Sequence, residues 1–534
     1  MGERRVYYRD MREFLQFLDD RGKLYRFTKP VSKDTEIGPL VALQMRGIPE
    51  PERRVLLFDD VRGASGERFD MRVACGLYGA SDELAVLGLG CESVTEVRDR
   101  WCNALASPMA SVMVDDAPVQ AVVHTGAAIA ERGLDMLPAP VEQPGLSQII
   151  RVGMPVITRD PETGVRNVGA YNAFFRDRDR ICAVMGTGTN ARQYHWQTAK
   201  RRGEALPMAI VIGATPNLMA VAGVRVPYGV DEIELASALA GQPLEMVRCK
   251  TIPLEVPAHA EIVIEGLAST ETLEPQLAFG EYPGYMRMER NLFPIMKVTA
   301  ITHRTDPIFT PVQVGYPGMD TKVTYMCSQA TFYYRLTRDL RLPVEDVHSF
   351  NGGSFVVVSL KKGFGKDAWQ VLNGVSTINP TSKFVIAVDY DIDPRDLEKI
   401  VWALTWRVRP ETDIVIQRGR KAGLDPSFGA TGSSEGKLDA GSWNQYFRVQ
   451  IDATMAGPFA PVALPKKEYM ERAREIWEET GLPRPVLNGM WWGYDLGHWN
   501  DEEQRLADLL VRGDYRAVGR YAEGLQVSVD EAGG

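Results

Sequence analysis

The sequence contains few of the residues from which compact metal centres and disulfide frameworks are built. It has six cysteines in 534 residues, with no Cys-x-x-Cys pair, and its six histidines stand apart with no two of them four residues apart. Structural zinc sites and disulfide scaffolds are recognised by closely spaced ligands of these types. We therefore expect buried, reduced cysteines and histidines with mainly structural roles.

Positive charge and long hydrophobic runs are also in short supply. There are 61 Lys and Arg residues against 70 Asp and Glu residues, which gives a net charge of −9. A nucleic-acid-binding face needs clustered basic residues, so nucleic acid is not an expected partner. No run of about 18 apolar residues occurs, and residues 1–15 lack the apolar core of a secretory signal. We expect no membrane contact and a cytoplasmic location.

What the sequence does contain predicts an α/β protein in four parts. Residues 1–120 combine helix and strand patterns, including an amphipathic helix at 10–21, a strand at 54–61 and a helix at 81–89. Residues 121–320 are rich in strand patterns and are predicted to form a barrel-like sheet. Residues 321–464 return to strand–helix–strand order, which is typical of a second α/β domain. Residues 465–534 are predicted amphipathic helices that contact another domain or subunit.

Within the second part, a hairpin is predicted around the turn Pro-Glu-Thr-Gly at 161–164. One strand precedes this turn, and the apolar run of residues 165–175 is predicted to be the other strand. A further helix is predicted at 230–240, with Asp231 and Glu232 in its first turn, where carboxylates suit the helix dipole.

Three segments place polar residues within apolar strands or beside glycine-rich turns. They are RNVGAYN at 166–172, PYGVDE at 227–232 and FGEYPGY at 279–285. Taken singly, each has a structural explanation: Asn167 could satisfy a strand edge, Glu232 could be a helix-start charge, and Glu281 could lie on an exposed turn.

Taken together and in order, these segments resemble the UbiD family of reversible decarboxylases. Its members carry an Asn in an Arg-Asn-x-Gly-x-Tyr strand, a Glu after a Pro-x-Gly turn, and a Glu in a Phe-Gly-Glu-x-x-Gly-Tyr segment. The opening DMREFLQFLDDRGKLYRF, the strand LLFDDVRG and the helical segment VDYDIDPRDLEKIVWAL are also similar to the family. The resemblance implies that residues 121–320 form a split β-barrel that binds flavin, and that the chain forms a homo-oligomer, a dimer or a hexamer, through its C-terminal region.

The resemblance also implies a cofactor chemistry. Family members bind prenylated FMN, which a flavin prenyltransferase supplies, and tie its phosphate to the protein through a divalent metal, usually manganese, and potassium. The cofactor forms a transient covalent adduct with an aromatic or α,β-unsaturated carboxylic acid, from which carbon dioxide leaves. The protein then supplies an acid that protonates the carbon. The substrate could be a free acid or a CoA thioester.

By position, the resemblance assigns Glu281 to proton donation and Asn167 and Glu232 to the metal. The metal set is completed by Asn190. Contacts with the cofactor are expected from the residues of the same segments, namely Asn167, Val168, Gly169, Ala170, Tyr171, Asn172, Thr189, Asn190 and Glu232.

Four positions depart from the family pattern. Asn190 stands where the family has a metal-binding His, Asn172 where it has an Arg, and Gln276 where it has a second active-site Glu. A family Lys that contacts the flavin phosphate falls near Thr377. Replacing Arg by Asn and Glu by Gln removes one positive and one negative charge, so the change is electrically balanced. We therefore keep Asn172 and Gln276 beside Glu281 as predicted active-site positions.

These replacements change the expected chemistry. Without the family Arg, Glu281 is expected to lose a cation that favours its ionised form, so burial would favour its protonated form. An amide oxygen in place of imidazole makes the predicted metal site of Asn167, Asn190 and Glu232 an all-oxygen site. Such a site favours magnesium, calcium or potassium over manganese, or binds no metal. The nearest histidine is His195.

The loop Gly-Thr-Gly-Thr-Asn at 186–190 lacks the Gly-Lys-Ser/Thr ending of a phosphate loop, and no helix is evident directly after it, although we expect it beside the flavin.

The leading hypothesis is a decarboxylase with Glu281 as proton donor. The alternatives are a non-catalytic UbiD-like subunit of a multi-subunit carboxylase, which binds flavin weakly or not at all, and a protein that binds unmodified FMN.

Overall fold

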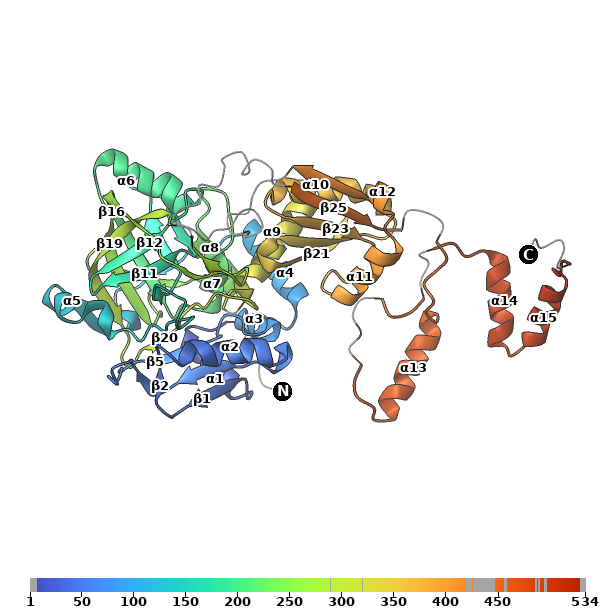
Figure 1. The fold of residues 1–534 in the computed structure, drawn as a ribbon, viewed down its shortest axis with the longest axis horizontal. Coiled ribbons are helices and arrows are strands. Elements are labelled where there is room, and N and C mark those ends of the chain that lie inside the picture. The colour runs from blue at the N-terminus through green and yellow to red at the C-terminus, as the bar shows by residue number, and fades with distance from the viewer. Residues whose placement is uncertain are drawn as a thin grey trace.

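The computed structural model describes residues 7–418 except 289 and 319, residue 425, and residues 447–455, 459–485, 487, 490–493 and 497–528. The fold is a mixed α/β architecture, as the sequence predicts. Figure 1 shows the N-terminal domain and the central sheet side by side, the C-terminal sheet next to them, and three terminal helices that extend away.

The N-terminal domain contains a four-stranded sheet in the order β1-β3-β5-β20. Its last strand comes from much later in the chain, so the sheet already joins this domain to the central one. The strands of this sheet are β1 (Leu24–Phe27), β3 (Val55–Phe58), β5 (Arg72–Cys75) and β20 (Ile308–Phe309), and the short β2 (Val31–Ser32) pairs with β4 (Val61–Arg62). The helices are α1 (Met11–Asp19), α2 (Ile37–Gly47), α3 (Asp82–Gly88) and α4 (Val94–Ala106).

The predicted helices at 10–21 and 81–89 are confirmed as α1 and α3. Each begins at a residue whose side chain caps the helix. Asp10 accepts a hydrogen bond from the backbone N–H of Glu13 at 2.9 Å, and Ser81 accepts one from Leu84 at 3.1 Å. These bonds satisfy backbone donors that the first helical turn leaves unpaired.

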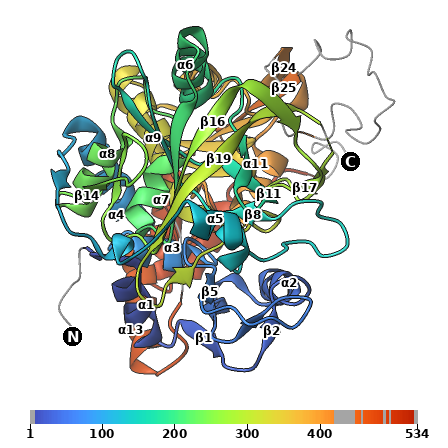
Figure 2. The same cartoon turned by 90° about the vertical axis from the view of Figure 1, so that its left-hand side faces the viewer.

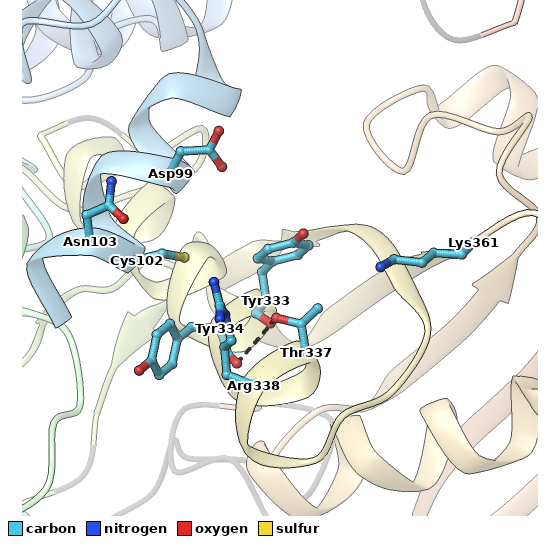
Figure 3. A pocket seen from close by; sticks show the side chains of 8 residues that line it. All are labelled: Asp99, Cys102, Asn103, Tyr333, Tyr334, Thr337, Arg338 and Lys361. Carbon is cyan, nitrogen blue, oxygen red and sulfur yellow. Dashed lines mark hydrogen bonds between the residues drawn. The ribbon is translucent and has the colours of Figure 1, made fainter. Parts of the chain in front are cut away.

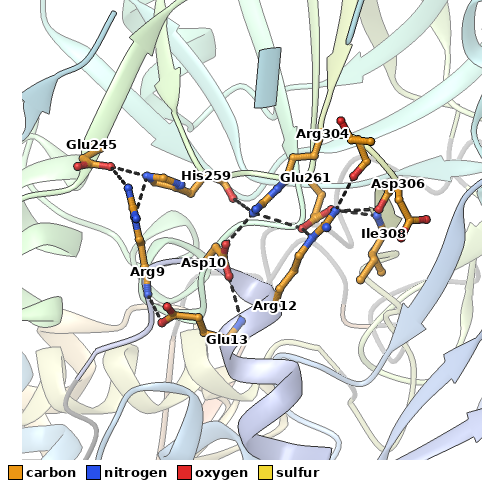
Figure 4. A network of polar contacts seen from close by, with 11 residues as sticks. Arg9, Asp10, Arg12, Glu13, Glu245, His259, Glu261, Arg304, Asp306 and Ile308 are labelled. Carbon is orange, nitrogen blue, oxygen red and sulfur yellow. Dashed lines mark hydrogen bonds and ion pairs between the residues drawn. The ribbon is translucent and has the colours of Figure 1, made fainter. Parts of the chain in front are cut away.

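A network of charged side chains around the buried Glu261 fixes α1 to the central domain (Figure 4). Arg12 donates from Nε and from Nη2 to the carboxylate of Glu261, each at 2.8 Å. The Glu261 side chain is fully buried and also accepts from the backbone N–H of Ile308 at 3.0 Å. Arg304 contacts Asp10 at 2.8 Å and Glu261 at 3.7 Å. The N-terminal helix is therefore held by ion pairs as well as by its apolar face.

The central sheet has nine antiparallel strands in the order β10-β9-β13-β16-β19-β12-β11-β8, with β7 also paired to β19. Figure 2 shows β16 and β19 crossing the body, with β1, β2 and α2 below them. The strands of the sheet are β7 (Val122–Thr125), β8 (Arg151–Val152), β9 (Val156–Arg159), β10 (Arg166–Gly169), β11 (Asn172–Asp177), β12 (Arg180–Val184), β13 (Leu206–Ile212), β16 (Ile262–Pro275) and β19 (Leu292–His303). The shorter elements nearby are β6 (Val112–Met113), β14 (Glu245–Arg248), β15 (Glu255–Pro257), β17 (Phe279–Gly280), β18 (Met286–Arg287), α5 (Ala127–Glu131), α6 (Gln197–Arg202), α7 (Pro216–Ala222) and α8 (Glu232–Ala240).

The predicted hairpin is confirmed, since β9 and β10 pair across the turn at 161–164 with Asn167 opposite Thr158. The prediction of one strand over residues 165–175 is wrong. It is divided into β10 and β11, which end at Gly169 and begin at Asn172 and lie near opposite edges of the sheet. Three Cα–Cα steps span at most about 11 Å. The sheet must therefore curl until its two edges approach, which gives the half-barrel shape.

The C-terminal domain is a five-stranded sheet in the order β21-β22-β23-β25-β24, covered by helices on both faces. Along β22, Val356 and Val358 belong to the core beneath α10, and Val357 belongs to the core beneath α11. This alternation is that of a strand buried on both faces. The elements are α9 (Lys322–Tyr334), β21 (Val344–Phe350), β22 (Phe355–Leu360), α10 (Ala368–Ile378), β23 (Phe384–Val388), α11 (Leu397–Trp406), α12 (Pro410–Asp413), β24 (Ile414–Arg418) and β25 (Phe447–Ala453).

The last described helices are α13 (Lys467–Glu479), α14 (Asp501–Val511) and α15 (Tyr515–Glu523). None of these three helices buries a residue. They extend away from the rest of the chain (Figure 1). Among the described residues, no helix combines the length and the apolar character that crossing a bilayer requires.

Candidate functional site

The first cluster of predicted site residues forms at the break between β10 and β11. Asn167 is 4% exposed and donates from Nδ2 to the hydroxyl of Tyr171 at 3.0 Å. The same hydroxyl accepts a hydrogen bond from the backbone N–H of Ala191 at 3.5 Å. The Tyr171 ring folds back over Gly169, where a Cβ atom would overlap it, so glycine is needed there. One tyrosine thus joins the predicted segment 166–172 to Ala191, the residue directly after the predicted loop 186–190.

Glu232 reaches this cluster from the first turn of α8. It is 3% exposed, and its carboxylate accepts a hydrogen bond from the backbone N–H of Val168 at 3.0 Å. Burial raises the pKa of Glu232 to about 7, although the bonds from Val168 and from its own backbone N–H oppose this shift. Asp231 is the cap that precedes the helix and does not lie in its first turn. It accepts from Ile233 N–H at 2.8 Å and pairs with Arg166 at 2.6 Å.

Thr189 and Asn190 lie directly before a helix. A π-helical segment, Ala191–Trp196, begins after Asn190 and continues into α6. The expectation that no helix follows this loop is therefore wrong. A π-helical turn departs from the 3.6-residue repeat by which helices are recognised in a sequence, and this explains the error. The Thr189 hydroxyl donates to the carbonyl of Gly186 at 2.8 Å and closes the turn.

His195 lies close to this cluster, where its ring contacts Thr158. It is fully buried, and its Nδ1 atom lies 2.9 Å from the hydroxyl of Thr158, the cross-strand partner of Asn167. Its Nε2 atom makes no hydrogen bond with the described residues. Burial lowers the pKa of His195 to about 4, so the ring is neutral at pH 7.

The donor atoms offered to a metal are oxygens. Within the described ranges, no three His, Cys, Asp or Glu side chains converge on a point that could hold a metal ion. The predicted set of Asn167, Asn190 and Glu232 offers two amides and one carboxylate. Because Asn167 uses its nitrogen to contact Tyr171, it would bind a cation through its oxygen. This chemistry suits a hard cation.

The second cluster surrounds Glu281, which follows β17 and is 7% exposed. Its carboxylate lies 3.8 Å from the guanidinium of Arg287. Although Asn172 replaces the family Arg, a different cation therefore lies near Glu281. β17 and β18 form an antiparallel pair in which Arg287 lies opposite Phe279. This pairing places the arginine near the Glu281 carboxylate.

Asn172 takes part in this second cluster through an arginine that the sequence analysis did not select. Its Oδ1 atom accepts a hydrogen bond from Arg151 Nη1 at 2.8 Å. Arg151 also donates from Nη2 to the carbonyl of Gly280, the residue before Glu281, at 3.0 Å. Gln276 is fully buried, and its backbone N–H bonds to the carbonyl of Asn291 at 2.9 Å.

Arg151 is itself paired with Glu142, at 2.7 Å, and their side chains are only 2% and 7% exposed. Burial raises the pKa of Glu142, the charge of Arg151 opposes that shift, and the charge of Glu281 adds to it. The signal that could have identified Arg151 was available. A charged residue in the apolar run SQIIRVGMPV has to be paired when the run is buried.

A cavity of about 400 Å³ opens beside Glu281, between α2 and the central domain. Its polar lining includes Glu142, Gln143, Glu281 and Gln313, and its apolar lining includes Val41, Met45, Met286 and Val314. A second cavity of about 480 Å³ lies where α4 meets the end of α9 (Figure 3). The residues lining this second cavity include none of the predicted site residues. Thr377 lies exposed on α10, and its hydroxyl donates to the carbonyl of Asn373 in the same helix at 2.9 Å.

Comparison with known proteins gives matches along most of the chain. Three family models match in order: the 3-octaprenyl-4-hydroxybenzoate carboxy-lyase N-terminal domain at residues 15–101, its Rift-related domain at 111–317 and its C-terminal domain at 324–440.

Solved structures are similar over the same length. An evolved dimeric form of the enzyme HmfF from Pelotomaculum thermopropionicum, in complex with prFMN, is 28% identical with a TM-score of 0.72, covering 86% of this chain and 98% of that one. Vanillic acid decarboxylase from Sedimentibacter hydroxybenzoicus in its open form is 26% identical with a TM-score of 0.74, covering 88% and 100%. A 3,4-dihydroxybenzoic acid decarboxylase from Enterobacter cloacae, 23% identical with a TM-score of 0.73 over 91% and 98%, shares the fold.

Proposed function

We propose, from the premise that the chain belongs to the UbiD family of carboxy-lyases, that it removes carbon dioxide from an aromatic or α,β-unsaturated carboxylic acid, or catalyses the reverse reaction. The observation that supports this most is the position of Glu281. Its buried carboxylate lines a cavity of about 400 Å³ with apolar walls, and an acid in such a place is suited to protonate a carbon.

Prenylated FMN is the cofactor that we propose, because the HmfF relative was solved with prFMN. The cluster around Asn167, Tyr171 and Glu232, with Thr189 and Asn190, would hold it. When bound, the cofactor would supply an electron sink for decarboxylation. A cation beside the phosphate would offset the negative charge of Glu232, and the all-oxygen donor set favours magnesium or potassium over manganese.

The residues of this chain have separate tasks in the proposed reaction. The apolar lining of the cavity, including Val41 and Met286, excludes water from an aromatic or conjugated substrate. Glu281 holds the proton that replaces the lost carboxylate, and in the reverse direction it accepts that proton. Arg287 favours the ionised form of Glu281 after the transfer.

A substitution at Glu281 tests the proposed acid. The chain is co-produced with a flavin prenyltransferase, and the holoenzyme is assayed with vanillic, 3,4-dihydroxybenzoic, benzoic and cinnamic acids and with benzoyl-type CoA thioesters that carry a ring carboxylate. Glu281→Gln should retain the flavin spectrum and lose about 10²- to 10⁴-fold in kcat. Glu271→Gln, at an exposed carboxylate of β16, is the control and should keep wild-type activity. Full activity of Glu281→Gln would remove Glu281 from the mechanism.

Metal analysis tests the donor set. Purified holoenzyme should contain magnesium or potassium in preference to manganese, because Asn167, Asn190 and Glu232 offer only oxygen. Elemental analysis after dialysis measures this. Stoichiometric manganese or iron with nitrogen coordination from His195 would contradict the all-oxygen site.

The second candidate is a UbiD-like subunit that serves a multi-subunit carboxylase without catalysing the reaction. The replacements at positions 172, 190 and 276 favour it. A colourless protein after co-production with the prenyltransferase, inactive with every acid, would support this candidate. A plain yellow protein without the prenyltransferase would indicate unmodified FMN.

We also propose a homo-oligomer formed through α13, α14 and α15. These helices bury nothing within the chain and expose apolar side chains such as Ile476, Trp477 and Leu510. One relative was solved in a dimeric form. Dimer or hexamer, the domain boundaries at residues 120, 320 and 464, and the cytoplasmic location stay predictions.

A further inference from the structure

Gly280, the residue before Glu281, is held through both of its backbone polar groups by one earlier segment. The N–H of Gly280 donates to Gln143 Oε1 at 3.2 Å, and the C=O of Gly280 accepts from Arg151 Nη2 at 3.0 Å. A Cβ atom at position 280 would lie 2.6 Å from Gln143 Nε2, so the side chain can approach only a glycine. The backbone at Glu281 is therefore fixed by residues that lie more than 120 positions earlier in the chain.

Arg151 makes a contact through each of its three guanidinium nitrogens. Its Nε atom lies 2.7 Å from Glu142, its Nη1 atom bonds to Asn172 at 2.8 Å, and its Cζ atom lies 5.3 Å from the centre of the Phe279 ring. The planar guanidinium presents donors in fixed directions, which a lysine ammonium cannot reproduce. The group is therefore suited to fixing geometry as well as to supplying charge.

The ion pair also supplies charges that two predicted active-site positions lack. Asn172 and Gln276 are neutral, whereas Arg151 and Glu142 bring one positive and one negative charge into the same buried region. Asn172 begins β11, and Arg151 lies on β8, the adjacent strand of the sheet. A guanidinium attached to position 172 would enter the space into which Arg151 now extends.

We propose that Arg151, anchored by Glu142, is the positioning residue for Glu281. This inference rests on the proposed role of Glu281 as proton donor. Arg151 does not contact the reacting carbon. It orients the peptide at Gly280, and through that peptide it directs the Glu281 carboxylate toward the cavity. Because removing only one partner would leave a buried charge unpaired, the informative variant is Glu142→Gln combined with Arg151→Gln.

Hydrogen exchange of the full-length, cofactor-free protein tests the positioning directly. In the double variant, backbone amides of residues 276–288 should exchange about 10-fold faster than in the wild type. Arg151→Lys should not keep the slow exchange of the wild type. Arg151→Gln combined with Asn172→Arg should restore it, because the guanidinium then comes from the neighbouring strand. Arg100→Gln, which removes a partly buried arginine of α4 that bonds to the carbonyls of Leu89 and Gly90, is the matched control and should leave these amides unchanged.

Kinetics of the holoenzyme separate positioning from general loss of structure. With whichever acid of the panel the wild type converts, the double variant should lose about 100-fold in kcat with little change in KM and an unaltered flavin spectrum. The variant with Asn172→Arg should recover at least about 10-fold of that loss.

Failure of this inference and failure of the proposed function are distinguishable. If the wild type converts no acid, the proposed function fails, and the exchange rates alone decide whether Arg151 positions Glu281. The inference would be overturned if these amides exchanged at the wild-type rate in the double variant. It would also be overturned if they exchanged at the same rate in Arg151→Lys and in Arg151→Gln combined with Asn172→Arg.

Discussion

Buried carboxylates are a recurrent feature of this molecule. Glu232, Glu142 and Asp320 are each removed from water, and burial is the largest cause of the raised pKa in all three. Asp320 is fully buried and accepts hydrogen bonds from the backbone N–H groups of Tyr78 at 3.4 Å and Gln313 at 3.2 Å. It thereby joins the N-terminal domain to the segment that lines the cavity.

Asp320 should make stability depend on pH. Burial raises its pKa to about 7, above the value of about 4 for an unfolded chain. The folded state therefore binds more protons between these values, and stability should fall as pH rises from about 4 to about 7. Asp320→Asn removes this titration, and asparagine tolerates the positive φ of 56° at this position.

Thermal unfolding at pH 5 and pH 8 measures the effect. Between pH 5 and pH 8, the midpoint temperature should fall less in the variant than in the wild type. The difference corresponds to about 1–4 kcal/mol in the free energy of unfolding. An identical pH dependence in both proteins would show that Asp320 does not titrate in this range.

At the scale of elements, the attachment of α1 decides how firmly the N-terminal domain is held. Arg12 bridges α1 to Glu261 of the central domain with two bonds of 2.8 Å, and the Glu261 side chain is fully buried. Arg304, at 3.7 Å, is a more distant partner. Loss of Arg12 would thus leave Glu261 with incomplete charge compensation.

Arg12→Met should destabilise the protein by about 3 kcal/mol, the cost of removing one partner of a buried ion pair. Chemical unfolding followed by tryptophan fluorescence measures it. Arg26→Met is the control, since Arg26 is 44% exposed and pairs with Asp59 at 3.3 Å, and it should cost less than about 1 kcal/mol. Equal losses of unfolding free energy for the two substitutions would show that the Arg12–Glu261 pair stabilises the protein no more than an exposed ion pair does.

At the scale of the whole molecule, the terminal helices α13, α14 and α15 bury none of their residues against the rest of the chain. They extend from the body with apolar side chains exposed, among them Trp477 at 42% and Leu510 at 54% (Figure 1). Such a surface is stable in water when another chain covers it.

Deletion of residues 465–534 should therefore reduce the oligomer to a smaller species. Size-exclusion chromatography with light scattering measures the mass of the full and shortened chains. Trp477→Asp should weaken assembly in the same direction, and Arg472→Ala, at an exposed ion pair of the same helix, should not. An unchanged mass after deletion would place the interface elsewhere.

Much of this protein was determined by its sequence alone. Local rules identified α1, α3 and the hairpin at 161–164, because periodicity, capping and turn residues act over a few residues. Three ordered motifs identified the family, since their spacing reflects one common fold.

The tertiary structure decided which side chains meet. The contact between Arg151 and Gly280 joins residues 129 positions apart, and no local pattern encodes it. The break after Gly169 and the return of Arg287 to Glu281 also depend on how strands pair and curl. Sequence patterns identify elements, whereas the charges around Glu281 follow from the curvature of a sheet that brings distant strands together.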